Sequence, residues 1–247
     1  MSRNYANKQV CDVDIRYLAT KKPFLYFSNA NTTGQTVSGE SVYAYARGRR
    51  KVAFPEPMEG TLTIEAQVMP FELFAMLSDG KIYTEGSFGS HEVVTCTTAG
   101  ELTISGTPDA NAGIYVYPEG SINETSEIEG TFADGKVTAT GATANTVYEV
   151  FYTTTKASGI KRVRFSDDLI VNDFLVDMST LWKDEDGVYT PVIYRAYKAT
   201  PQRNFELSES SSGDPITVTI TLDMLTDKEG NFFDMIEDTE NTATSGG

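Results

Sequence analysis

Two segments alternate apolar and polar residues with a period of two, and this pattern constrains the fold most strongly. In residues 61–68 every second residue is apolar, and Thr, Glu or Gln stands between them; residues 216–223 repeat the pattern. Successive side chains of a strand point to opposite faces, so this alternation is typical of strands with one buried and one wet face. The sequence therefore predicts an all-β protein. Further strands are predicted at residues 24–28, 41–47, 160–165, 171–182, 188–198 and 203–208.

One segment departs from the strand pattern. Residues 69–80 open on Met-Pro and end at Gly80, and proline suits a first helical turn as glycine suits a helix end. Phe71, Phe74 and Leu77 are spaced to cover a core. A helix is therefore predicted over 69–80, with a second, weaker candidate over 230–237.

The middle of the chain has a composition of its own. Residues 92–157 carry two basic and nine acidic residues and five or six short β-patterns separated by turns. This spacing predicts a small β-sandwich or barrel module inserted into a larger β-domain. The predicted domains are thus a discontinuous body, 1–91 with 158–247, and an acidic insert, 92–157.

The first sixty residues are rich in turn-forming and polar residues. Residues 28–36, 48–51 and 55–60 are predicted to be long loops. Long loops in compact domains usually have a function.

The overall charge limits the partners. Thirty-five acidic residues against twenty basic ones give a net charge of −15, which argues against tight binding to DNA or to an anionic membrane. No apolar run approaches a membrane span, and the first residues lack the apolar run of a secretory signal. Cys11 and Cys96 are accordingly expected to be reduced thiols.

Residues suited to catalysis are scarce. His91 is the only histidine, and no nucleophile motif surrounds a serine, so no enzyme is predicted. One histidine and two remote cysteines do not supply a zinc site, and no cofactor motif is present. Residues 183–187 resemble part of a calcium loop, but the glycine spacing favours a hairpin turn.

A compact basic cluster stands out against the acidic chain. It comprises Arg47, Arg49, Arg50 and Lys51. Three interpretations are open: a small nucleic-acid patch, a solvated hairpin tip, or a loop that docks against acidic residues of another copy of the chain.

Several patterns together resemble a known family. Residues 57–67 followed by 71–80 resemble the strand-then-helix core of the major tail tube proteins of long-tailed bacteriophages. Residues 174–176, 186–187, 201–208 and 213–222 are similar to the closing strands of that family. The resemblance covers residues 10–91 and 158–236, and the insert departs from the minimal family core.

This resemblance implies two packed antiparallel β-sheets flanked by a helix. It also implies hexameric rings that stack into a hollow tube, which conducts DNA from the virion. Such a tail is assembled in the host cytoplasm and contacts other tail proteins. Strands with one wet face suit a tube wall, and an acidic lumen would repel DNA phosphates.

Counting by two along the strands identifies candidates for the lumen. Glu65, Asp177 and Asp223 fall on the wet faces of their strands and are predicted to face the channel. The outer wall of the tube is the alternative position for the same faces. The basic cluster at 47–51 is the predicted inter-subunit loop.

A binding function is the main alternative to this structural one. A β-sandwich adhesin or carbohydrate-binding module could use tyrosines of the insert for sugar stacking, although alternating tyrosines are also ordinary strand residues. The tyrosines concerned are Tyr115, Tyr117, Tyr148 and Tyr152. A glycosidase is a third alternative, but no pair of acids is marked out for it.

Overall fold

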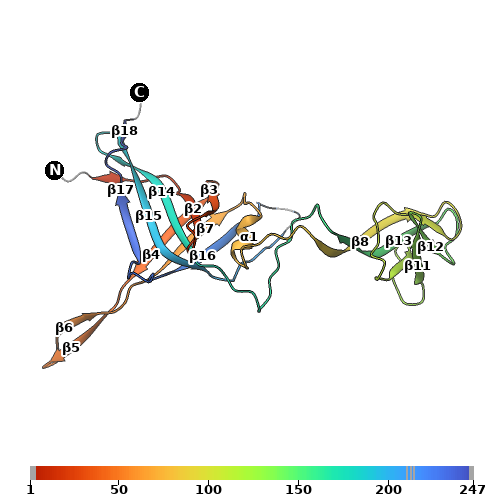
Figure 1. The fold of residues 1–247 in the computed structure, drawn as a ribbon, viewed down its shortest axis with the longest axis horizontal. Helices are drawn as coiled ribbons and strands as arrows, with labels where there is room; N and C mark the ends of the chain where they lie inside the picture. The colour runs from red at the N-terminus through yellow and green to blue at the C-terminus, as the bar shows by residue number, and fades with distance from the viewer. Residues whose placement is uncertain (1–3, 210, 212, 214, 245–247) are drawn as a thin grey trace. The chain divides into compact units, whose positions relative to one another are not determined.

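The computed structural model describes residues 4–209, 211, 213 and 215–244, and its regular secondary structure is almost entirely β-strand (Figure 1). The all-β class with a minor helical part is confirmed. The chain divides into two compact units: a body, formed by the residues up to 81 and from 163 onward, and an insert, residues 82–162. The predicted insert, 92–157, lies inside the second unit.

The body holds one ten-stranded antiparallel sheet. Its strands run in the order β3-β2-β14-β15-β16-β7-β4, while β1 pairs with β14, and β17 and β18 pair with β15. The strands are β1 (Tyr5–Ala6), β2 (Asp12–Tyr17), β3 (Pro23–Phe27), β4 (Thr32–Ser38), β7 (Glu59–Ala66), β14 (Phe174–Asp184), β15 (Val188–Pro201), β16 (Val218–Leu225), β17 (Phe233–Glu237) and β18 (Ala243–Thr244).

This sheet curls, because the strands at its two ends, β3 and β4, are consecutive along the chain. Only residues 28–31 connect β3 to β4, which stand at opposite ends of the strand order. The backbone N–H of Cys11, next to β2, donates to Thr33 Oγ1 in β4 at 3.0 Å. The sheet is therefore an incomplete barrel, and the body holds one curled sheet where the resemblance implied two packed sheets.

The apolar faces of these strands and one helix form a single core. Helix α1 (Glu72–Met76) contributes Leu73, Met76 and the adjoining Leu77, all fully buried. The helix is shorter than predicted, since the chain leaves the helical conformation before Gly80, which has φ +74°. The alternation in 61–68 and 216–223 correctly identified buried strand residues, including Leu62, Ile64, Val218, Ile220 and Leu222.

Several local predictions were wrong. The weaker helix at 230–237 is largely strand β17, which pairs with Val192–Ala196 of β15. Much of the predicted loop 28–36 is strand β4, which pairs with β7. In contrast, neither 160–165 nor 203–208 forms a named strand. Pairing with a strand distant in sequence decided the conformation of β4 and β17.

Residues 41–55 form a separate two-stranded hairpin, β5 (Ser41–Ala46) and β6 (Arg49–Pro55) (Figure 1). The strand predicted at 41–47 is confirmed. The early part of the chain is thus largely strands rather than the predicted long loops.

The insert has its own six-stranded antiparallel sheet and its own core. Its strands are β8 (Gly86–Thr95), β9 (Glu101–Thr103), β10 (Ile114–Pro118), β11 (Ile128–Ala133), β12 (Lys136–Ala139) and β13 (Val147–Lys156), in the order β8-β13-β10-β11-β12-β9. Cys96, Leu102, Val116, Val137 and Val150 are fully buried at its centre. The pairing of β8 with β13 begins at Gly86 and Lys156, which is why the unit is wider than the predicted 92–157.

Candidate functional site

The polar residues of the body strands share the face of the sheet opposite the core, which we call the outer face. On β7 and β16 this face is rich in threonine. The register places Glu65 opposite Thr219, and Asp223 opposite Thr61. On β14 the same face carries Asp177, while Phe174, Val176 and Met178 are buried in the core.

A line of mostly charged residues crosses the outer face. Strand register joins one residue from each of five adjacent strands: Tyr26, Asp14, Asp177, Arg195 and Asp234. We call this line the charged row. Arg195 donates from Nε to Asp177 Oδ1 at 2.7 Å and from a terminal nitrogen to Oδ2 at 2.8 Å. The hydrogen bonds to Asp177 raise the pKa of Arg195 above its usual value.

The three predicted lumen residues lie on one face but do not form a cluster. Glu65, Asp177 and Asp223 are each half-buried on different strands of the outer face. Asp223 accepts a hydrogen bond from Gln202 Nε2 at 2.7 Å, whereas Asp177 is held by Arg195.

Sequence reasoning missed the positive charges of this face. Arg16 pairs with Asp14 in the charged row, and Arg195 pairs with Asp177. The signal was present, because counting by two from the apolar Val192 and Tyr194 places Arg195 on the polar face of β15. The outer face is therefore less negative than its acids alone suggest.

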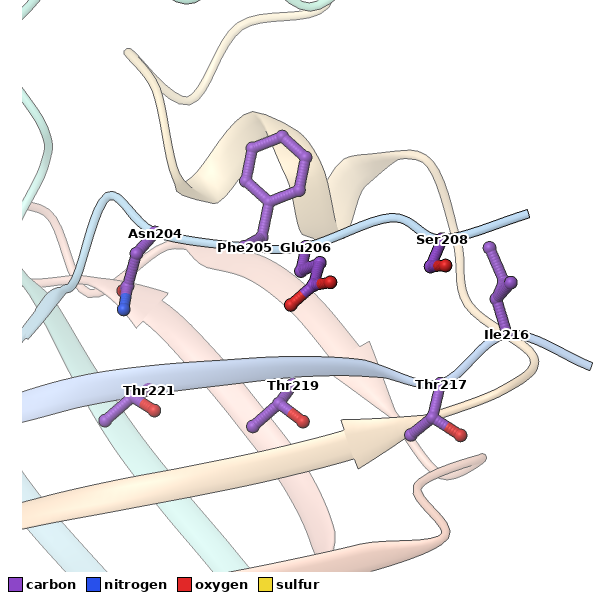
Figure 2. Close-up of a pocket in the computed structure, with 8 residues that line it drawn as sticks. All are labelled: Asn204, Phe205, Glu206, Ser208, Ile216, Thr217, Thr219 and Thr221. Atoms are coloured by element: carbon purple, nitrogen blue, oxygen red, sulfur yellow. The ribbon is translucent and has the colours of Figure 1, made fainter. Parts of the chain in front are cut away.

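A groove lies beside one edge of β16. Pairing with β15 spans Leu222–Leu225, and the N–H of Gln202 still reaches the carbonyl of Thr221 at 2.8 Å. Toward the start of β16, segment 204–208 is no longer paired with the strand, and a cavity of about 520 Å³ lies between them, lined in part by Thr217 and Thr219. Figure 2 shows Phe205 turned toward the helix and Glu206 toward β16.

The basic cluster lies at the tip of the β5–β6 hairpin, as one of the three interpretations predicted. Arg47 and Gly48 form the turn with positive φ, and Arg49, Arg50 and Lys51 follow exposed in β6. The hairpin also exposes apolar side chains along its length. These are Val42, Tyr45, Val52 and Phe54, with exposed fractions of 49–62%.

Residues considered for chemistry have structural partners. His91 Nε2 lies 3.0 Å from Glu149 Oε2, and its ring stacks on Phe151. Asp184 Oδ1 accepts backbone N–H groups of Asp186 and Val188, so the hairpin turn predicted at 183–187 is confirmed. Within the described ranges, no three His, Cys, Asp or Glu side chains are grouped to hold a metal ion.

Two further findings concern thiols and membranes. Cys11 and Cys96 are buried free thiols, and burial raises the pKa of Cys11. Of the helical segments in the described part of the chain, none has the length and apolar character to cross a membrane.

Glu92 of the insert has the most perturbed carboxyl group. Burial by itself would raise its pKa, but hydrogen bonds from the Tyr152 hydroxyl, from Ser105 and from the backbone of Gly106 lower it to about 2. Burial and the bond to Glu92 raise the pKa of Tyr152 to about 12. Glu92 thereby ties the chain after β9 to strand β8, which is a structural role.

The tyrosines of the insert separate into two groups. Tyr148 and Tyr152 are only 3% and 5% exposed, so the four-tyrosine sugar surface considered from the sequence is wrong for these two. Tyr115 is 45% exposed and Tyr117 is half-buried.

Comparison with known proteins identifies the family. The profile of the YomU/Tube protein family matches residues 8–235, which include both the body and the insert. A search of curated proteins finds no match. Because the matched range spans nearly the whole chain, the protein belongs to the YomU/Tube protein family, a phage-derived family of tube-like proteins.

Proposed function

We propose that copies of this protein form hexameric rings that stack into the tail tube of a long-tailed bacteriophage, through which DNA leaves the virion. The observation that carries the proposal is the curled ten-stranded sheet, whose outer face carries the charged row and the Thr-rich part of β7 and β16, in a chain of a tube family. The role is structural, without catalysis or a cofactor. Assembly takes place in the host cytoplasm, and other tail proteins contact the tube ends.

In this proposal the outer face contributes to the wall of the lumen. A wall that DNA must slide past needs polar side chains without an array of free cations, because each phosphate contact adds salt-dependent affinity. The arginines in and beside the charged row fit this need, since Arg195 in the row and Arg16 beside it are both paired with aspartates. Glu65 and Asp223 add negative charge to the Thr-rich part of the face.

Two features supply contacts between copies. The first is the edge of β16 beside the groove at Thr217 and Thr219, where a strand of a neighbouring copy could add by backbone hydrogen bonds. The second is the β5–β6 hairpin, whose exposed apolar side chains and basic tip leave a large surface to bury. The net acidity of the chain offers complementary charge for that tip.

A charge-reversal variant of the hairpin tests the proposal. The four residues Arg47, Arg49, Arg50 and Lys51 are changed to Glu, and assembly is followed by sedimentation velocity and negative-stain imaging. The control reverses the same number of exposed lysines elsewhere in the body, at Lys8, Lys21, Lys22 and Lys228. Both variants change the net charge equally.

We expect the unaltered chain and the control to form rings or tubes, and the tip variant to remain monomeric while folded. An unaltered chain that stays monomeric at every concentration, without any ring form, would contradict the proposed function. If the tip variant forms tubes as readily as the unaltered chain, the hairpin tip is not part of the interface between copies.

A further inference from the structure

The insert carries an aromatic surface that the tube does not require. His91, Phe151 and Tyr115 stand opposite one another on the adjacent strands β8, β13 and β10. All three point to the side of the insert sheet away from its core, which contains their neighbours Val150, Tyr152 and Val116. We call His91, Phe151 and Tyr115 the aromatic row.

Neighbouring contacts fix the geometry of this row. The rings of His91 and Phe151 stack at 4.5 Å with 21° between their planes, and Glu149 holds the imidazole from one side. Tyr117 packs edge-on against Phe151 at 5.9 Å. These contacts orient the rings before any ligand arrives, which lowers the entropic cost of binding.

A shallow cavity lies over the row. Its volume is about 280 Å³, room for a single sugar ring, and Gly89, Gly113 and Thr153 line it beside the aromatic residues. The Tyr115 ring lies over Gly113, where an added Cβ would come within 2.6 Å of the Tyr115 hydroxyl. At Gly89 an added Cβ would meet nothing within 4 Å, so the cavity is open there.

The lining selects a class of ligand. Aromatic faces bind the apolar C–H face of a sugar ring, while the hydroxyls of Tyr115 and Thr153 offer hydrogen bonds to sugar hydroxyls. A nucleic-acid base could also stack, but the segment 92–157 holds nine acids against two basic residues and repels phosphate. The chemistry therefore favours an uncharged glycan.

We propose that the aromatic row of the insert is a binding site for a neutral saccharide, which would place a glycan-binding surface on each copy of a tube-family protein. The inference rests on the insert alone. It stands whether or not the body assembles into a tube.

Ligand-detected saturation-transfer NMR on the full chain tests this site, with maltose, cellobiose and N,N′-diacetylchitobiose as probes and oligothymidylate as the anionic comparison. The variants are Tyr115→Ala, which removes one wall, and Gly89→Leu, which fills open space over the row without a backbone clash. The control is Phe88→Ala, because Phe88 is 44% exposed against 45% for Tyr115 but points to the opposite face of β8.

We expect at least one of the three sugars to receive saturation, and its affinity to fall about tenfold or more in both site variants but not in Phe88→Ala. Unchanged amide spectra of the insert in each variant show that it remains folded. The proposal is overturned if none of the sugars binds, if binding survives both site variants, or if oligothymidylate binds in place of the sugars.

Discussion

Arg195 and Asp177 join strands β14 and β15 through two hydrogen bonds on the polar side of the body sheet, at 2.7 and 2.8 Å. The two residues stand directly opposite in the strand register. The pair is partly exposed, with 37% of the Arg195 side chain and 15% of the Asp177 side chain accessible. It neutralises the charge of Asp177, so this acid cannot be treated as a free negative charge of the outer face.

Removing the carboxylate should therefore affect stability. We expect Asp177→Ala to lower the free energy of unfolding by about 1 kcal/mol, since a charged hydrogen-bonded pair is lost but solvent screens part of its energy. Urea denaturation followed by the fluorescence of Trp182, the single tryptophan of the chain, measures this in the body. Asp167→Ala, an exposed aspartate, should change the value by less than about 0.5 kcal/mol. Equal effects in the two variants would show that the pair does not stabilise the body.

The parts of the fold predicted from sequence are those specified by local alternation. In β7 and β16 the apolar residues of the repeating pattern are buried, because the two strands pair with each other and turn these residues toward one core. In contrast, β17 contains Phe233 and Ile236, whose spacing also suits a helix. Pairing with β15 decides its conformation, and that partner is not visible in the local sequence.

The candidate site was predictable to a similar degree. Counting by two placed Glu65, Asp177 and Asp223 on polar faces, but it could not show that Arg195 stands opposite Asp177 while threonines stand opposite the other two, since register is set by hydrogen bonds between distant strands. The sugar-binding alternative named Tyr148 and Tyr152, which face the core. Phe151 lies between them in sequence, and strand alternation places it on the other face.

The low pKa of Glu92 predicts an acid-sensitive insert. The folded value of about 2 lies below the ordinary value of 4.5, so its contribution to stability is present above pH 4.5 and is lost as the pH falls toward 2. The protection factors of the β8 and β9 amides, which correct the exchange rates for the intrinsic effect of pH, should fall over this range. In Glu92→Gln we expect lower protection of these amides at neutral pH and a weaker dependence of their protection on pH.

The control is Glu101→Gln, the same Glu-to-Gln change at an exposed ion pair with Lys136, and it should retain the pH dependence. An identical acid profile in Glu92→Gln would assign the sensitivity to another group.

The apolar residues of the hairpin should matter for assembly and not for folding. Tyr45 and Phe54 are 62% and 56% exposed, so Tyr45→Ser with Phe54→Ser removes little buried area from the isolated chain. We expect the free energy of unfolding to change by less than about 0.5 kcal/mol and ring or tube formation to be lost. Urea denaturation and sedimentation velocity measure the two effects separately. A large loss of stability in the monomer would mean that the hairpin packs on its own chain.

The insert should be dispensable for assembly. Its two ends lie side by side, since the N–H of Tyr83 donates to the carbonyl of Arg162 at 2.9 Å and the reverse bond measures 2.8 Å. A short Gly-Ser linker can therefore replace residues 84–161 without separating these ends. We expect a folded body that still assembles, judged by Trp182 fluorescence and negative-stain imaging. A soluble, folded variant that forms no rings or tubes would place the insert in the core interface.

The position of the outer face in the proposed tube can be tested through Glu65 and Asp223. Asp177 is left unchanged, because a lysine there would stand beside Arg195 and confuse repulsion within the chain with attraction to DNA. The variant is Glu65→Lys with Asp223→Lys, both half-buried on the Thr-rich part of the face. Tubes should still form, since neither residue belongs to the core. If these positions line the lumen, the new cations attract phosphate, and DNA release from particles slows at low salt and recovers at high salt.

The control, Asp167→Lys with Glu124→Lys, makes the same charge change at exposed positions outside the body strands and should release DNA normally. Normal release by the outer-face variant at both salt concentrations, with tubes formed, would place Glu65 and Asp223 on the outside of the tube.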